Sequence, residues 1–361
     1  MISWWRTSFG DREVEKLRES VQKECIGQGL VTEEFEEEIS LALNVPFVVA
    51  TTNGSAALYM ALLSLGIGHG DEVIIPNRTW IASANAILLT GAKVVLVDVR
   101  SDLPLIDVAQ IQSKITTQTK ALMPVHLNGR SADMQGIQRL AEKFGIPIIE
   151  DACQAFFSSN SSGYLGTQSD VGCFSLGVTK LVSTGQGGFV VTKNRDVYER
   201  LKCIRNHGVT DEFTESYDQF GFNFKFTDLL ASFGLVQLSR VSKRIVHLNK
   251  IYAKYESAIS KFKCVNLLPV NVLNGEIPLY AEVLCPERKE LENFLHFHNI
   301  QARIVPPDLS TSSCIKDDGS FPNSIRFSDQ GLYLPCGPEQ PLENIDFVTD
   351  TLYDSVCYVQ S

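Results

Sequence analysis

The chain has 361 residues, of which 44% are hydrophobic and 20% are charged, a mixture typical of a folded globular protein rather than a disordered one. Asp and Glu together number 42 against 32 Lys and Arg, so the formal net charge is -10. An acidic chain without a long basic run lacks the cationic face that nonspecific nucleic-acid binding requires, and we expect no nucleic-acid partner.

The first residues and the cysteines indicate the compartment in which the protein works. The charged segment 11–19 leaves no room for the apolar core of a signal peptide, and no apolar run is long enough to span a membrane. The nine cysteines are scattered and contain no CxxC pair, which signals neither a zinc site nor a disulfide framework. We therefore expect a cytoplasmic protein with no membrane partner.

Two helices are predicted between residues 11 and 43. Leu17 and Val21 repeat on one face of the first helix. The glycines of residues 27–29 interrupt the pattern before the second helix, whose acidic run, residues 33–38, we interpret as a solvated face.

Short apolar runs then alternate with helical stretches. The predicted strands are 47–50, 73–75, 94–98, 121–125 and 147–151. The predicted helices between them are 55–65, 80–89 and 133–144, the last closed by Gly145. Strands spaced by helices imply βαβ units and a mostly parallel sheet in an α/β fold.

The second half of the chain changes in character. Strands are predicted at 171–176 and 188–192, with a hairpin or bulged turn near Gly185, and a long helical stretch at 228–259. Nine prolines lie in the final third, which is typical of a smaller α+β domain. We predict a large domain, 1–245, that includes the N-terminal helices, and a smaller C-terminal domain, 246–361.

Polar clusters follow several predicted strands, at the sheet edge where α/β proteins bind ligands. The first, residues 51–57 (TTNGSAA), lies at a strand-to-helix junction. The free N–H groups of a helix start make a phosphate site there, with Gly54 allowing close approach and Ser55 adding a hydroxyl. A plain serine N-cap would explain the same residues without a ligand.

Two further clusters carry charged side chains. Residues 148–154 (IIEDACQ) deliver Asp151 to the end of an apolar strand; once buried it needs a cationic partner, unless it merely caps a helix. Lys180 lies between an apolar strand and a glycine-rich turn, where a lysine is poorly placed for simple solvation. It is a candidate nucleophile or base, although most lysines are surface residues.

Taken in order, several segments of the chain resemble the DegT/StrS family of pyridoxal-phosphate sugar aminotransferases, which belong to the fold-type I aminotransferases. The segments are NGSAAL (53–58), GDEVIIP (70–76), PVHL (124–127), EDACQA (150–155) and GFNF (221–224). The resemblance implies a large domain with a central, mostly parallel seven-stranded sheet, a smaller C-terminal α+β domain, and pyridoxal 5'-phosphate as the cofactor.

The resemblance also implies roles for four residues around the cofactor ring. Lys180 matches the lysine that forms the Schiff base with the cofactor and later moves the substrate proton. Asp151 matches the carboxylate that pairs with the pyridine nitrogen, and Gln154 the amide beside the ring hydroxyl. Trp80 matches the aromatic residue that stacks on the ring, although a core aromatic at a helix start is the alternative.

Four more residues match phosphate contacts of the family. Gly54, Ser55 and Ser175 correspond to contacts within one subunit. Asn223 corresponds to an asparagine that reaches the phosphate of the neighbouring subunit. This correspondence implies a homodimer with shared active sites.

The chain departs from the family pattern at several places. Thr179-Lys180-Leu181 and Gly185-Gln186-Gly187-Gly188 replace the common sequences around and after the lysine, which is itself present. Asn128-Gly129-Arg130 replaces a common Tyr-Gly, and residues 304–309 replace a histidine-containing stretch. The last two changes concern acceptor recognition, so transamination is better supported than an ordinary nucleotide-linked hexose as acceptor.

The expected function is amino transfer from glutamate to a keto-sugar, either nucleotide-linked or a keto-sugar acid, for an amino sugar of a surface polysaccharide. One alternative is a sugar dehydratase that uses pyridoxamine phosphate, which Lys180 disfavours. Another is a noncatalytic regulatory protein of the same fold, which the intact set of cofactor residues disfavours. His207 is left open between a substrate contact and a helix end.

Overall fold

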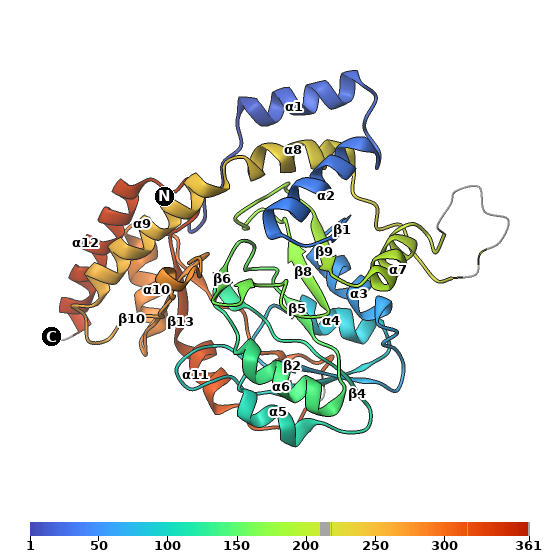
Figure 1. Cartoon of the computed structure of the whole chain (residues 1–361). Helices are drawn as coiled ribbons and strands as arrows, with labels where there is room; N and C mark the ends of the chain where they lie inside the picture. Colours follow the sequence, from blue (N-terminus) through green and yellow to red (C-terminus); the bar gives the residue numbers. More distant parts are fainter. Residues whose placement is uncertain (210–216, 218, 316, 360–361) are drawn as a thin grey trace.

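Seven strands form the central sheet of the computed structural model, which describes residues 1–209, 217, 219–315 and 317–359 (Figure 1). In spatial order they are β1 (Phe47–Thr51), β9 (Gly188–Thr192), β8 (Val171–Ser175), β5 (Ile149–Asp151), β4 (Thr119–Leu122), β2 (Glu72–Pro76) and β3 (Lys93–Val97). Parallel bridges Leu122–Ile148 and Val125–Asp151 join the four-stranded and three-stranded halves between β4 and β5. Only β9 runs antiparallel to its neighbours within this sheet. The predicted mostly parallel seven-stranded sheet is confirmed.

Both faces of the sheet are covered by helices, as parallel sheets require. On one face lie α3 (Gly54–Ser64), α4 (Ala82–Leu89) and α7 (Arg195–Arg205); on part of the other lie α5 (Val108–Lys114) and α6 (Met134–Phe144). Alternate residues of β2 divide between the two cores: Val73 and Ile75 pack with α3 and α4, whereas Ile74 packs with α5 and α6. Gly145 ends α6 in a left-handed conformation, as predicted.

The N-terminal helices pack against a helix from the middle of the chain. As predicted, α1 (Asp11–Gln22) and α2 (Leu30–Leu43) are separate, and both contact α8 (Asp228–Leu238) (Figure 1). Asp228 accepts hydrogen bonds from the backbone N–H groups of Gly29 and Thr32, each at 2.9 Å, which ties α8 to the break between the helices. The acidic face of α2 is mostly exposed, but Glu36 is half-buried against Arg205.

The helical stretch predicted at 228–259 is helical, and it consists of two helices. The chain turns at residues 239–240 between α8 and α9 (Val241–Ile259). The turn sends α9 away from the large sheet and onto the C-terminal part of the chain (Figure 1). Nothing in the local sequence marks the turn, since neither glycine nor proline occurs there.

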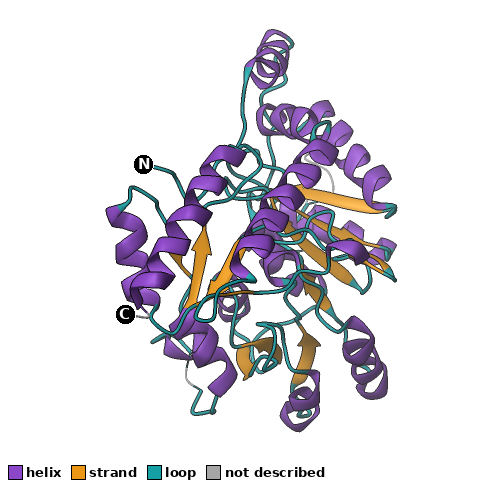
Figure 2. Cartoon of the chain, turned by 90° about the vertical axis from the view of Figure 1, so that its left-hand side faces the viewer, coloured by secondary structure: helices purple, strands orange, loops and turns teal. Residues whose placement is uncertain are grey.

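The C-terminal part contains a four-stranded antiparallel sheet. Its order is β10 (Asn266–Leu267), β11 (Ala281–Leu284), β13 (Gly331–Leu334) and β12 (Arg303–Ile304). The helices of this part are α9, α10 (Arg288–Phe297), α11 (Pro322–Gln330) and α12 (Leu342–Val359), and α12 packs against α9 (Figure 1). The C-terminal part of the chain faces the viewer in Figure 2, with helices beside the strands of this sheet. Short strands β6 (Ser159–Asn160) and β7 (Gly163–Tyr164) and 3-10 turns at Leu127–Gly129, Val272–Asn274 and Leu309–Thr311 complete the described elements.

The first six residues of the chain run beside this smaller sheet. Ile2 bridges Ile300, and Trp5 bridges Cys336, both in parallel. The N-terminus therefore belongs spatially to the C-terminal part, while the division at residues 245/246 stays a prediction. None of the described helices combines the length and the apolar character needed to cross a membrane.

Candidate active site

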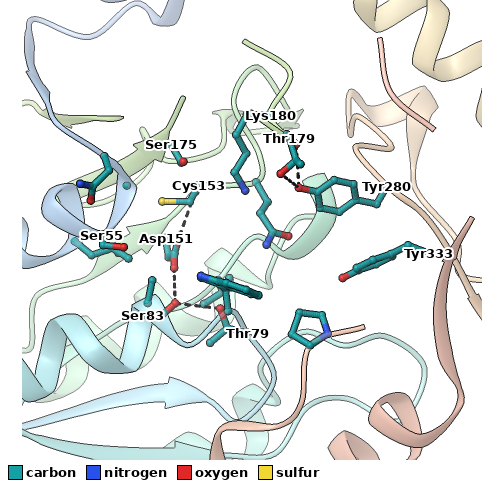
Figure 3. Close-up of a pocket in the computed structure, with 18 of the residues that line it drawn as sticks. Ser55, Thr79, Ser83, Asp151, Cys153, Ser175, Thr179, Lys180, Tyr280 and Tyr333 are labelled. Atoms are coloured by element: carbon teal, nitrogen blue, oxygen red, sulfur yellow. Dashed lines mark hydrogen bonds between the residues drawn. The ribbon is translucent and has the colours of Figure 1, made fainter. Parts of the chain in front are cut away.

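A cavity of about 640 Å³ lies between the carboxyl ends of the large-sheet strands and the smaller sheet (Figure 3). Seven of the eight residues predicted from the sequence line it, and they come from segments that follow β1, β2, β5 and β8. They are Gly54, Ser55, Trp80, Asp151, Gln154, Ser175 and Lys180. The fold thus gathers in one place residues that are up to 126 positions apart in the sequence (180 minus 54).

Lys180 is carried by the loop between β8 and β9, and other segments hold this loop by its backbone carbonyls. Tyr280 donates its hydroxyl to the carbonyl of Thr179 at 2.9 Å. Arg244 donates to the carbonyl of Leu181 at 2.9 Å, so both neighbours of the lysine are fixed. Burial, with the charge of Arg240, lowers the pKa of Arg244 to about 10, which leaves it charged at neutral pH.

A third contact to the lysine loop comes from the N-terminal segment. Trp5 donates its indole N–H to the carbonyl of Val178 at 3.2 Å. The loop also folds on itself, because the N–H of Lys180 donates to the carbonyl of Gly177 at 3.0 Å. The Lys180 side chain points into the cavity, which Thr179 and Gln186 of the same loop also line (Figure 3).

Asp151 ends β5, and its carboxylate is buried at the floor of the cavity, 4% exposed. Ser83 of α4 donates to Oδ2 at 2.7 Å, and the N–H of Cys153 donates to Oδ1 at 3.1 Å (Figure 3). Thr79 in turn lies 3.0 Å from the Ser83 hydroxyl. No ion pair joins Asp151 to any described side chain, so a cation for this carboxylate would have to come from a ligand.

The neighbouring carboxylate has a structural role instead. Glu150 points to the other side of β5, because successive strand residues alternate, and it is fully buried. It accepts hydrogen bonds from His126 at 3.0 Å and from the N–H groups of Gly166 and Gln168, each at 2.7 Å. Of these two carboxylates, Asp151 lines the cavity and Glu150 does not.

Gln154 follows Asp151 and is oriented by the loop after β4. The N–H of Asn128 donates to its Oε1 at 2.9 Å. Asn128 itself donates to Glu282 of β11 and has a left-handed backbone, φ 56°. Glu282 is neutralised by the buried side chain of Arg130 at 2.8 Å. The departure from the family pattern at Asn128-Gly129-Arg130 thus forms one buried network that reaches across to the smaller sheet.

The other end of the cavity contains the N-terminus of α3. Asn53, not Ser55, caps this helix by accepting from the N–H of Ala56 at 2.8 Å, which corrects the serine N-cap interpretation. Gly54 packs so closely that a Cβ there would lie 2.8 Å from Ser175 Cβ and 3.0 Å from Cys153 Sγ. Burial and, after it, the charge of Asp151 raise the pKa of the Cys153 thiol, which stays protonated.

These residues fit pyridoxal phosphate. The glycine cradle places the positive end of α3 and the hydroxyls of Ser55 and Ser175 at one end of the cavity, suited to a phosphate. Asp151 lies at the floor with no cationic protein partner among the described residues, suited to a protonated ring nitrogen. Lys180 reaches the same space from another loop, and Trp80, 46% exposed, offers its ring at the cavity wall.

Asn223 is the predicted site residue that the structure does not bring to this cavity. Its exposed side chain accepts from the N–H of Lys225 at 3.4 Å, and its backbone bridges Asn206. Phe220 and Phe222 beside it are 64% and 60% exposed. This placement leaves the predicted contact to a neighbouring subunit untested.

His207 also lies outside the lining of this cavity. It follows the C-terminal end of α7, is exposed, and has a left-handed backbone with φ 58°. Its N–H donates to the carbonyl of Phe222 at 3.1 Å. Within the described chain it closes a helix and makes no contact with the cavity.

Sequence reasoning missed the residues on the opposite wall. Trp4, Tyr280, Arg303 and Tyr333 line the cavity from the first residues of the chain and from the smaller sheet or its edge. No motif marks them, since they belong to short segments spread from residue 4 to residue 333. Their only signal in the sequence is that aromatic residues and arginine are common in binding sites.

The departure at residues 304–309 also reaches the cavity. Pro306 lines it, and Asp308 anchors the stretch through a buried ion pair with Arg78 at 2.7 Å. Burial raises the pKa of Asp308 from its usual range, and Arg78 opposes this shift. The N–H of Leu309 donates to the carbonyl of Asn77 at 2.9 Å, so the segment is fixed to the end of β2.

Comparisons with known proteins also indicate an aminotransferase. The model of the DegT/DnrJ/EryC1/StrS aminotransferase family matches residues 8–353. GDP-perosamine synthase of Escherichia coli O157:H7 is 31% identical over 355 residues, which cover 97% of each chain. The dTDP-3-amino-3,4,6-trideoxy-alpha-D-glucose transaminase of Streptomyces venezuelae is 33% identical over 329 residues, covering 88% of this chain and 86% of the relative.

A solved structure shares the whole architecture. DesV of S. venezuelae, determined in complex with a ketimine intermediate, superimposes with a TM-score of 0.91 at 29% identity. The match covers 95% of this chain and 94% of that protein. The likeness therefore includes both the large sheet and the smaller C-terminal part.

Proposed function

The chain belongs to the DegT/DnrJ/EryC1/StrS aminotransferase family, and from this premise we propose that it transfers an amino group from glutamate to a nucleotide-linked keto-sugar. It is a pyridoxal-phosphate-dependent sugar aminotransferase. The product would be an amino sugar destined for a surface polysaccharide. The relatives named above are enzymes of GDP-linked and dTDP-linked amino sugars, which supports a nucleotide-linked acceptor over a keto-sugar acid.

The observation that carries the proposal is the joint placement of Lys180 and Asp151. They come from different loops, and both side chains enter one cavity whose far end is the N-terminus of α3 (Figure 3). When bound, pyridoxal phosphate supplies an aldehyde that bonds to amines and a ring that withdraws electrons from the substrate carbon.

In this proposal Lys180 has two tasks. Its Nζ holds the cofactor between turnovers, and, once a substrate amine has displaced it, it takes the proton from the α-carbon of glutamate. In the second half of the reaction the same amine returns a proton to the sugar carbon that receives nitrogen. The hydrogen bonds to the carbonyls of Thr179 and Leu181 hold the backbone of the lysine in place while Nζ moves between the cofactor and the two substrate carbons.

Asp151 stabilises positive charge on the ring nitrogen in this proposal. Ser83 and the N–H of Cys153 hold the two carboxylate oxygens in place, so the charge is fixed before the reaction begins. Two unit charges about 4 Å apart attract by about 4 kcal/mol at an effective dielectric constant of 20. The remaining assigned residues, Gln154 and Trp80, would orient the ring from its edge and its face.

Borohydride trapping tests the assignment of Lys180. The purified protein should be yellow, and reduction should fix the cofactor covalently to the peptide that contains Lys180, as measured by mass spectrometry. Lys180→Ala should bind the cofactor without this link and lose turnover by about 10⁴-fold or more. Labelling of another lysine in the wild-type protein would refute the assignment.

The substrates are tested separately in half reactions. Glutamate should convert the bound cofactor to its amine form and release 2-oxoglutarate, and a panel of nucleotide-linked keto-sugars and keto-sugar acids should reverse the change. An enzyme that removes a sugar hydroxyl without transferring nitrogen would be the dehydratase alternative. If the protein reacts with no amino donor, the noncatalytic alternative is supported.

A further inference from the structure

The cavity wall opposite Asp151 and Ser55 consists of aromatic side chains and one arginine. Tyr280 and Tyr333 lie on this side of the cavity (Figure 3). Arg303 of β12 is the register partner of Tyr333 on β13, so the two side chains leave the sheet on the same face. The Trp4 ring lies 6.4 Å from the Tyr333 ring and 5.8 Å from the Tyr280 ring, measured between centroids.

Trp4 also holds the arginine in place. The guanidinium carbon of Arg303 lies 4.7 Å from the centre of the Trp4 ring. The guanidinium lies over the Trp4 ring and donates to no described residue, so its N–H groups are open to other partners. The backbone of Trp4 is fixed as well, because its carbonyl accepts from the N–H of Cys336 at 2.8 Å.

Arg303 has no carboxylate partner among the residues that the structure describes, unlike three other arginines of the chain. Arg78 pairs with Asp308, Arg130 with Glu282, and Arg205 with Glu36. Arg303 is half-buried, lines the cavity and forms no ion pair with a described side chain. A cation held at a cavity wall without a counterion is a binding group for an anionic ligand.

We propose that Arg303 binds the anionic oxygens of both substrates, a carboxylate of the donor in one half reaction and a phosphate of the acceptor in the other. The inference rests on the proposed function, which supplies the two substrates. Both must reach the same Lys180, so they occupy the cavity in turn, and both are anions. The planar fork of arginine pairs with carboxylate and phosphate alike, each through two parallel hydrogen bonds.

The aromatic surroundings explain how one group can serve two ligands. Trp4, Tyr280 and Tyr333 are neutral, so they do not compete with a ligand for the charge of Arg303. Their faces also suit the apolar side of a sugar ring, whereas the flexible carbons of glutamate need no shaped surface. The wall therefore combines a shared anion contact with a surface that only the sugar uses.

The test measures binding directly on the holoenzyme, whose phosphate end is already filled by the cofactor. Glutarate is the probe for carboxylate binding and inorganic pyrophosphate is the probe for phosphate binding. Calorimetric titration measures the dissociation constant of each. Arg303→Gln should weaken both by about 10- to 100-fold. Arg303→Lys should recover part of each loss, because it keeps the charge without the planar fork. Trp4→Leu should cost about 2- to 5-fold through the lost stacking.

A matched control exists elsewhere in the chain. Arg326 lies over the ring of Phe327 at the same 4.7 Å, but on α11 and outside the cavity. Arg326→Gln should leave both titrations unchanged. Cofactor absorbance and the thermal midpoint of each variant check that the fold and the loaded site survive.

The outcomes separate this inference from the proposed function. If Arg303→Gln binds both probes as wild type does, the inference is overturned. If its affinity falls for only one probe, Arg303 is not a contact that the two substrates share. Weaker binding of both probes, together with higher KM values for glutamate and for the acceptor, supports the inference. If wild-type protein binds both probes through Arg303 but transfers no nitrogen from glutamate, the proposed function fails while the anion contact stands.

Discussion

Asp151 shows how a single carboxylate can be tested apart from the fold around it. Asp151→Asn keeps the shape of the side chain but removes the charge that would stabilise a protonated ring nitrogen. We expect turnover to fall by about 100-fold, because the lost interaction acts on charge that develops during the reaction. Cofactor affinity should fall by about tenfold or less. Rapid-mixing spectroscopy of the glutamate half reaction and a cofactor titration measure the two effects.

Ser83→Ala is the control for that experiment. It removes the 2.7 Å hydrogen bond to Oδ2 but keeps the negative charge. Its turnover should therefore lie between wild type and Asp151→Asn. Near-wild-type turnover in Asp151→Asn would show that this residue has a structural role only.

Glu72 offers a second prediction at the residue scale, on stability and pH. Thr116 donates to its carboxylate at 2.6 Å, and this bond, followed by Lys93, lowers the pKa of Glu72 below 4.5 against the opposing effect of burial. A lowered pKa in the folded state adds stability above the unfolded pKa, and this stability is lost as pH falls through the folded pKa. Thr116→Val should therefore destabilise the protein by about 1–2 kcal/mol at pH 7.

The pH dependence of that effect is its signature. Thermal midpoints of wild type and Thr116→Val should differ most near pH 7 and converge as the pH falls through the lowered pKa of Glu72 in the folded protein. Lys93→Gln is a suitable control, because the Lys93 side chain is 68% exposed and a surface pair contributes little. A difference that stays constant as the pH falls from 7 to the acid unfolding of the protein would contradict the prediction.

At the scale of elements, the approach of α3 to β8 makes the phosphate end of the cavity. A Cβ at Gly54 would meet Ser175 Cβ at 2.8 Å, which a flexible side chain cannot relieve. Gly54→Ala should therefore push the helix start away from Ser175. We expect the dissociation constant for pyridoxal phosphate to rise by about 10- to 100-fold, since overpacking of this kind costs about 1–3 kcal/mol.

Gly27→Ala is the control for Gly54→Ala. A Cβ at Gly27 would meet no atom within 4 Å, so Gly27→Ala should leave cofactor affinity unchanged. Fluorescence titration of the two apoproteins with the cofactor measures the difference. Equal affinities would mean that the close contact of α3 with β8 does not shape the phosphate site.

At the scale of the whole molecule, Asn223 lies outside the cavity of its own chain, next to exposed Phe220 and Phe222. If it reaches the phosphate of a second subunit, Lys180→Ala and Asn223→Asp should complement each other. One hybrid site of a mixed dimer would then contain both intact residues, so the mixture should regain up to about a quarter of wild-type activity. The added charge beside the phosphate is what should disable the second variant.

Activity measured after confirmed subunit exchange tests that arrangement. Each variant alone should be inactive, and native mass spectrometry of the mixture shows whether hybrids form. Hybrids without recovered activity would reject the shared site while leaving the role of Lys180 untouched. A monomer at working concentration would reject it as well.

The sequence by itself determined the seven strands, the helices of the first half other than α5, and the strand ends near which Gly54, Asp151 and Lys180 lie. These are local properties: alternation and helical periodicity show over a few residues, and catalytic side chains follow strands directly. The helices α5 and α7 escaped prediction, although Val197, Leu201 and Ile204 of α7 recur at helical spacing. The turn between α8 and α9 escaped it because neither glycine nor proline occurs there.

Only the tertiary structure decided the opposite wall of the cavity. Trp4, Tyr280, Arg303 and Tyr333 come from the N-terminus and from strands of two to four residues or their edges, which are too short to show a period. Their meeting depends on the bridges of Ile2 and Trp5 to the C-terminal part and on the register of β12 with β13. Such contacts between distant segments follow from the packing of the whole chain, and no local pattern encodes them.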